Sequence, residues 1–517
     1  MKHKYLFVLP LLIALSTGCS FKDIVNPTQE DPVIYIPTEQ GVYKARSIYS
    51  YKTFALNNFY TISSSPSIGT SNLLIIPVWF TNSDSYISTS KKENVRKDIE
   101  KAYFGTASET GWESVASYYK KDSFSNLSLT GVVSDWYSCG KHSSEFYSSS
   151  EGGAATAELV RSAVTWYKET YGVLSLKDFD TDKDGYLDGV MLIYGAPNES
   201  TLHISAPNMW AYCYWLQDTS LKSTFNPGPN AFFWASYDFM YSGGVTAIEH
   251  SGKTYGYGDT SHCLIDSHTY IHEMGHIFGL EDYYDYSKTA SPAAGFSMQD
   301  ENIGGHDPYS RLALGWVTPY VPTETCTFTV KNMESSGELV LIKPDLYTSP
   351  FDEYILLELY SNTGLNELDC NYAYNNKTQG PKSVGMRIWH IDARLFSVTE
   401  SDIQGNIKAG FVTNDPTKGG VIHATSNSVS GSYATNLAGN VNYHIIELIR
   451  NNKNAQYNNN SSLSSNDLFY EGDEFSISTY FRQFVNKTKL NNKTAFNWTV
   501  KINSLNSEEM NITCTKN

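Results

Sequence analysis

Two histidines and a glutamate in one short segment form the combination of residues best suited to chemistry. His272, Glu273 and His276 lie in the sequence IHEMGHIFGLED, which covers residues 271–282. On a helix, His272 and His276 are one turn apart on the same face, so both imidazoles can reach one metal ion. Glu273 is then placed to take a proton from water at that metal. The spacing therefore predicts a zinc site with a base beside it.

A zinc site of this kind needs a third protein ligand and an open fourth position for water. Gly279 can adopt a positive φ angle, end the helix and turn the chain back. Asp282, ten residues after His272, would then present a carboxylate oxygen to the metal. Glu281 and Asp285 are the alternative third ligands, and a solvated surface helix is the alternative without a metal. The expected zinc ligands are His272, His276 and Asp282.

A second candidate metal site is the acidic segment DTDKDGYLD at residues 180–188. Alternating carboxylates, a glycine for the sharp turn and a backbone carbonyl are the oxygen ligands of calcium loops. The twelfth place is Met191, where an EF-hand carries a bidentate Glu, and the flanking segment reads as a strand. We therefore expect a structural calcium loop, with a solvated acidic turn as the alternative. Its expected ligands are Asp180, Asp182, Asp184, Tyr186 and Asp188.

The N-terminus has the features of an export signal. Lys2 and Lys4 precede an apolar run of about 11 residues, and small residues lead to Cys19. The run is too short to span about 30 Å of hydrocarbon. Cys19 directly after Gly18 resembles a bacterial lipobox, in which the cysteine is lipidated and becomes the mature N-terminus. We expect a lipoprotein signal peptide over residues 1–18 and a lipid anchor to a bacterial membrane or cell surface, with secretion as the alternative.

The composition excludes several classes of protein. The chain has 517 residues with 54 acidic and 38 basic side chains, so its net charge is −16. A nucleic-acid-binding protein would need a basic face, which this balance opposes. A hydrophobic content of 41% is too high for a disordered chain. Six cysteines remain after Cys19, and disulfides and buried free thiols are both open interpretations. They are Cys139, Cys213, Cys263, Cys326, Cys370 and Cys514.

The elements that must position these residues change in type along the chain. Residues 73–80 and 189–194 read as buried strands, and residues 95–103 and 159–167 have the apolar spacing of amphipathic helices. From residue 321 onwards, short alternating strands and polar loops follow one another. We expect an α+β fold with a tether and N-terminal extension, a mixed α and β domain and a β-rich, sandwich-like domain. Their expected ranges are 19–70, 71–320 and 321–517.

The zinc motif resembles the HExxHxxGxxD pattern of the metzincin clan of zinc peptidases. Its context resembles the immune inhibitor A family of secreted bacterial metallopeptidases, in which GLxDxYD follows the histidines. Residues 294–300 (AGFSMQD) are similar to that family's methionine-turn segment. Glu281 stands where Pro is common, and Ser297 where an acidic residue is usual. The matching segments are residues 279–285 (GLEDYYD), 314–316 (LGW), 385–392 (GMRIWHID) and 467–470 (DLFY).

This resemblance implies a metzincin-like catalytic domain with a mixed sheet and an active-site helix. It implies a zinc endopeptidase that cleaves protein or peptide substrates, with Met298 beneath the metal and Glu273 as the base. A monomer is expected. A non-catalytic surface binding protein that keeps the fold is the alternative function, and a zinc hydrolase of another amide is a third. Tyr284, His306 and Tyr309 are candidate oxyanion donors, for which a structural role is the alternative.

Overall fold

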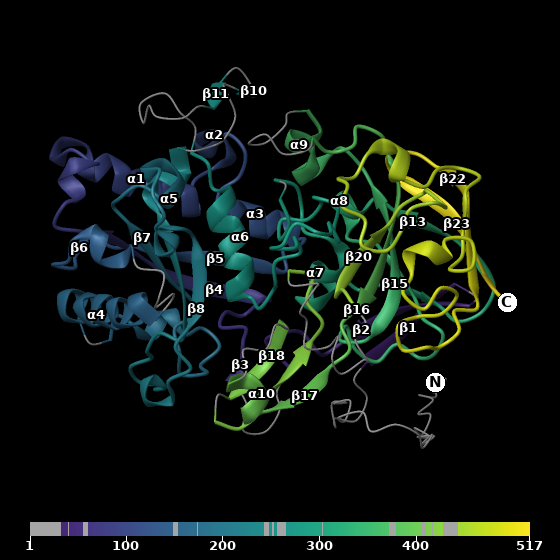
Figure 1. Ribbon diagram of the computed structural model, residues 1–517, viewed down its shortest axis with the longest axis horizontal. Helices are drawn as coiled ribbons and strands as arrows, with labels where there is room; N and C mark the ends of the chain where they lie inside the picture. Colours follow the sequence, from purple (N-terminus) through teal and green to yellow (C-terminus); the bar gives the residue numbers. More distant parts are fainter. Residues whose placement is uncertain are drawn as a thin grey trace, which may run out of the picture.

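The computed structural model describes residues 33–517 except 40, 55–59, 148–153, 173, 242–247, 251–252, 256–264, 302, 372–378, 405–409, 416 and 428–442. The expected signal peptide, Cys19 and Cys263 lie outside the described residues. The described chain has a mixed α/β fold with several sheets and few helices, which is compatible with the expected α+β class (Figure 1). No helix in this part of the chain is both long and apolar enough to cross a membrane.

The first half of the chain is built around one sheet with strand order β5-β4-β7-β9-β8, and β6 pairs with β4. β4 runs parallel to β5, β6 and β7, and β7 runs parallel to β9. β8 pairs antiparallel with β9 and forms one edge. The strands are β4 (Gly69–Trp79), β5 (Leu127–Val133), β6 (Tyr137–Ser138), β7 (Val190–Tyr194), β8 (Tyr212–Trp215) and β9 (Ala231–Ser236).

Helices cover both faces of this sheet. β7 is buried along its whole length, as expected for a strand of a parallel sheet that is covered on both sides. Met191 and Ile193 belong to the core cluster that includes α1, α3 and α6, whereas Leu192 and Tyr194 belong to the cluster that includes α4. The helices expected near residues 95–103 and 159–167 are confirmed. The bounds are α1 (Lys92–Phe104), α3 (Val115–Asp122), α4 (Ala154–Tyr171) and α6 (His268–Ile277).

The second half contains two packed sheets. One has the order β1-β2-β12-β14-β15-β16-β20 and the other the order β13-β23-β22-β21, and a shared apolar cluster lies between them. The bounds are β1 (Val33–Glu39), β2 (Val42–Ser47), β12 (Tyr320–Pro322), β13 (Cys326–Lys331), β14 (Val340–Ile342), β15 (Glu353–Tyr360), β16 (Gly385–Asp392), β20 (Ile446–Ile449), β21 (Glu474–Phe475), β22 (Trp498–Leu505) and β23 (Glu509–Lys516).

Smaller elements complete the described chain. A third sheet has the order β17-β19-β18-β3, and β10 and β11 form a separate pair. The strands are β3 (Tyr60–Thr61), β10 (Ile248–His250), β11 (Lys253–Tyr255), β17 (Phe396–Thr399), β18 (Gly410–Asp415) and β19 (Gly419–His423). The short helices are α2 (Ala107–Thr110), α5 (Glu199–Leu202), α7 (Pro308–Ala313), α8 (Met333–Ser336), α9 (Glu367–Asn371) and α10 (Glu400–Gln404).

The beginning of the described chain belongs to the sheet of the second half. β2 pairs antiparallel with β12, so that Tyr43 lies opposite Val321, and β1 forms the edge beyond β2. In Figure 1 these purple strands lie beside the green strands of the second half. The chain then reaches the first half, where the Tyr51 side chain lies against Gly279 at the end of α6. The N-terminal segment therefore connects both halves and supports the candidate site.

Candidate metal centre

The helix α6 carries the two histidines, and a glycine ends it. Gly279 has φ +101°, and its amide donates to the carbonyl of His276 at 2.9 Å. The amide of Leu280 donates to the carbonyl of Gly275 at 3.0 Å. A Cβ atom at Gly279 would lie 3.2 Å from the Tyr51 ring, so the position requires glycine for both conformation and space. The turn expected from the sequence is present, and it brings Asp282 back over α6.

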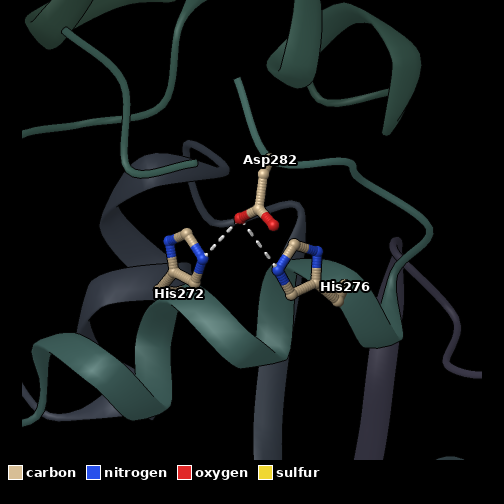
Figure 2. Close-up of side chains that lie close together, drawn as sticks. All are labelled: His272, His276 and Asp282. Carbon is tan, nitrogen blue, oxygen red and sulfur yellow. Dashed lines mark hydrogen bonds and ion pairs between the residues drawn. The ribbon is translucent and has the colours of Figure 1, made fainter. Parts of the chain in front are cut away.

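His272, His276 and Asp282 converge on one point (Figure 2). Asp282 Oδ1 lies 2.9 Å from His272 Nε2 and 3.3 Å from His276 Nε2. His272 Nδ1 donates to the Met298 carbonyl and His276 Nδ1 to the Leu280 carbonyl, each at 2.8 Å. Since a carbonyl can only accept, both Nδ1 atoms carry a proton, which leaves Nε2 of each ring as the atom that can bind a metal.

These three atoms lie close enough together to share one cation. A tetrahedral zinc ion with bonds of about 2.0–2.1 Å separates its ligand atoms by about 3.3 Å, which agrees with these distances. Burial would raise the pKa of the Asp282 carboxyl, but His276 and His272 outweigh it and hold that pKa well below its usual range. The donor set of two imidazoles and one carboxylate fits zinc.

The two alternative candidates for the third ligand form hydrogen bonds elsewhere. Glu281 accepts a hydrogen bond from Asn427 Nδ2 at 3.0 Å, and burial raises its pKa to about 7. Asp285 accepts from the hydroxyls of Ser287 and Thr289 at 2.6 and 2.7 Å. Neither residue belongs to the group of potential metal ligands found among the described residues. The geometry therefore selects Asp282 from the three candidates.

The Glu273 side chain lies beside the two histidines but is not one of the three converging groups. Its side chain is buried and lines a cleft of about 1110 Å³ that also exposes His272 and Asp282. Burial raises the pKa of Glu273, although the nearby His276 and His272 oppose the shift. Cys213, on the edge strand β8, points its thiol at the Glu273 carboxylate, with Sγ 3.5 Å from Oε2. A buried carboxylate of this kind can accept a proton from a group in the cleft.

The remaining residues predicted around the zinc site divide between the cleft and the core. Met298 is fully buried and touches the site through its carbonyl, which accepts from His272. Tyr284 lines the cleft, with its ring centroid 6.3 Å from that of His272. Tyr309 and His306 are buried, and the cleft lining includes neither of them. Of the three candidate oxyanion donors, only Tyr284 is therefore placed near the site.

Gly275 within the motif lets a supporting side chain approach α6. A Cβ atom there would lie 2.2 Å from Gln299 Oε1, which His306 Nε2 also contacts at 3.2 Å. His306 in turn contacts the buried carboxylate of Asp122. Gln299 therefore cannot move aside without disturbing a buried polar network, and an overpacked position of this kind is destabilising.

We expect Gly275→Ala to lower the free energy of unfolding by about 1–3 kcal/mol because of this contact. In a Gln299→Ala background the same substitution should be neutral or stabilising, since alanine is the better helix former. Chemical denaturation of the four proteins measures both effects. Equal destabilisation in the two backgrounds would show that Gln299 is not the cause.

In the acidic loop, only three of the expected carboxylate ligands lie close enough together to hold one cation. Carboxylate oxygens of Asp180, Asp182 and Asp188 lie within 4.8 Å of one another. Asp184 is outside this group, and Lys52 Nζ lies 2.8 Å from both Asp182 Oδ2 and Asp184 Oδ2. Asp180 Oδ1 is buried and has no hydrogen-bond partner. The loop therefore has an internal cation on one side and an unsatisfied buried oxygen on the other.

Tyr186 is placed by the same loop, which turns at Gly185 with φ +93°. The Tyr186 amide donates to Asp184 Oδ1 at 2.8 Å. Asp188 accepts four hydrogen bonds, from the Thr181 amide and hydroxyl, the Asn72 amide and the Ser71 hydroxyl, at 3.0, 2.6, 2.8 and 3.4 Å. Burial raises the Asp188 pKa to about 6. The Asp188 carboxylate is thus fixed in the loop.

Comparison with models of known protein families and with curated proteins found no match for this chain.

Proposed function

We propose that the protein is a zinc-dependent endopeptidase with a metzincin-like catalytic domain that hydrolyses proteins or peptides outside the cytoplasm. The observation that supports this most strongly is the convergence of His272, His276 and Asp282, with the Glu273 carboxylate beside them in an open cleft. Zinc held by these residues would act as a Lewis acid that lowers the pKa of water and polarises a carbonyl.

The protein's own residues would position the substrate and move the proton. β8 is an edge strand and lines the cleft through Tyr212, Cys213 and Trp215, so an extended peptide could pair with it. Glu273 would take the proton of the attacking water and later return it to the leaving amine. A binding protein that keeps the fold has no use for such a base, which favours the enzyme over the non-catalytic alternative.

Removal of the metal tests this proposal. We expect a strong chelator such as 1,10-phenanthroline to abolish casein degradation, and dialysis into buffer with one equivalent of zinc to restore it. Calcium or magnesium at the same concentration should not restore it, because two imidazoles are poor ligands for hard cations. Undiminished cleavage by the metal-free protein would exclude zinc catalysis.

We propose calcium as the ligand of the acidic loop, held by Asp180, Asp182 and Asp188. Added calcium is then expected to raise the melting temperature by mass action, because it binds the folded state. Asp182→Ala should reduce this gain, and Lys52→Met is the matched variant that keeps every carboxylate. A melting temperature that stays constant across a calcium titration would show that the loop is a solvated turn and not a calcium site.

The proposed location follows from the N-terminal sequence alone. A signal peptide over residues 1–18 and lipidation at Cys19 would hold the mature protein at a bacterial membrane or cell surface. The catalytic cleft would then act on extracytoplasmic proteins.

A further inference from the structure

We propose that Tyr286 is a positioning residue that fixes the Asp282 carboxylate so that a single oxygen, Oδ1, faces the metal. The inference rests on the proposed zinc site. Asp282 Oδ1 faces both imidazoles, whereas Oδ2 accepts a hydrogen bond from the Tyr286 hydroxyl at 2.5 Å. The tyrosine therefore engages the oxygen that points away from the histidines.

The position of Tyr286 is itself fixed from two sides. Its amide donates to the carbonyl of Asn427 at 2.9 Å, which ties it to the second half of the chain. Its ring lies 5.5 Å from that of Tyr284, whose ring lies 6.3 Å from that of His272. The two tyrosines thus form a continuous chain of contacts from Asp282 to His272.

The hydrogen bond has a definite consequence for metal binding. A carboxylate without a partner on its second oxygen can rotate and place both oxygens on a cation. With Oδ2 held by Tyr286, Asp282 would offer one oxygen to a bound zinc ion, which would leave the fourth position of a tetrahedral site to water. Hydrogen bonds to ligating carboxylates commonly contribute 10- to 100-fold in metal affinity.

Tyr286 also allows a clean test, because 57% of its surface is exposed. Tyr286→Phe removes the hydroxyl and leaves the ring in place, so the fold should not change. Tyr212→Phe is the matched control, since Tyr212 lines the same cleft but its hydroxyl bonds to Thr156 at 2.9 Å. Both variants are made in the full mature chain.

We expect Tyr286→Phe to weaken zinc binding about 10- to 100-fold in competition with a chromogenic chelator, with the melting temperature of the metal-free protein unchanged. The visible absorption bands of the cobalt-substituted protein should also shift, because the carboxylate binds differently. Tyr212→Phe should match wild type in both measurements. Wild-type affinity or unshifted cobalt bands in Tyr286→Phe would overturn the inference while the zinc site stands. Absence of zinc binding in wild type would overturn both.

A separate observation concerns two cysteines of the second half. Cys326 on β13 lies directly opposite Cys514 on β23, and their thiols contact each other. Directly opposite residues of antiparallel strands have Cα atoms about 4.5–5.5 Å apart, within the range that a disulfide spans. Both thiols are unbridged here, and both are buried.

We infer that Cys326 and Cys514 form a disulfide in the mature protein. Each thiol loses its proton, one S–S bond forms, and the two electrons reduce a low-molecular-weight disulfide such as oxidised glutathione to two thiols. The bond would join the first strand of the smaller packed sheet to the last strand of the chain.

Mass spectrometry of the full chain, alkylated without reduction after exposure to oxidised glutathione, tests this pairing. We expect a cross-linked peptide that contains both cysteines, and a lower melting temperature in Cys514→Ser than in the oxidised wild type. Cys370→Ser is the control, since its thiol bonds to the Tyr360 hydroxyl. Complete alkylation of Cys326 and Cys514 would overturn the inference.

Discussion

Replacing Glu273 with alanine is expected to lower kcat for peptide cleavage by about 10²- to 10⁴-fold while zinc content stays at the wild-type level. Glu273 is buried against the cleft and is not one of the three converging ligands. Its loss therefore removes the proton acceptor and leaves the metal in place. Steady-state kinetics with a fluorogenic peptide, together with zinc analysis of the same samples, measure both quantities.

The matched control for this prediction is Glu281→Gln. Glu281 lines the same cleft and is also buried enough to raise its pKa, but its partner is Asn427. Its substitution should change kcat by much less than that of Glu273. If Glu273→Ala retained near-wild-type kcat with full zinc content, another group would have to be the base.

Asp282→Ala is expected to weaken zinc binding by more than about 100-fold, because it removes one of three ligands rather than a supporting hydrogen bond. Activity should fall together with zinc content. Asp282→His should keep part of the affinity, since an imidazole can also serve as a third zinc ligand. Chelator competition provides the affinities.

Glu281→Ala distinguishes Asp282 from its neighbour. Its carboxylate accepts from Asn427 and lies outside the converging group, so zinc affinity should stay close to wild type. The opposite order, with Glu281→Ala more damaging than Asp282→Ala, would assign the third ligand to Glu281. The roles of His272 and His276 would not change.

The local part of the candidate site was predictable from sequence. His272 and His276 are one helical turn apart, and Gly279 ends the helix, so the spacing favoured Asp282 as the third ligand while leaving Glu281 and Asp285 open. The buried strands and amphipathic helices of the first half were also predictable, since their apolar patterns reflect burial on two faces or on one. The position of Glu273 beside the histidines follows from its place in the motif, whereas the role expected for Met298 comes from the family resemblance.

Contacts between distant segments were not predictable in this way. Lys52 contacts both Asp182 and Asp184, although more than a hundred residues separate Lys52 from the acidic loop. The sequence near the loop does not indicate this internal cation. Cys213 meets Glu273 only because β8 lies beside α6. The N-terminal strands join the sheet of the second half, a pairing for which a tether-like composition gives no signal.

The most direct test of the central claim is cleavage-site profiling of a protein mixture with zinc-loaded wild type and zinc-loaded Glu273→Ala. The proposed endopeptidase predicts new N-termini at internal positions of many substrates with wild type and almost none with the variant. Zinc-loaded wild type that produces no internal cleavage, or equal cleavage by the two proteins, would contradict it.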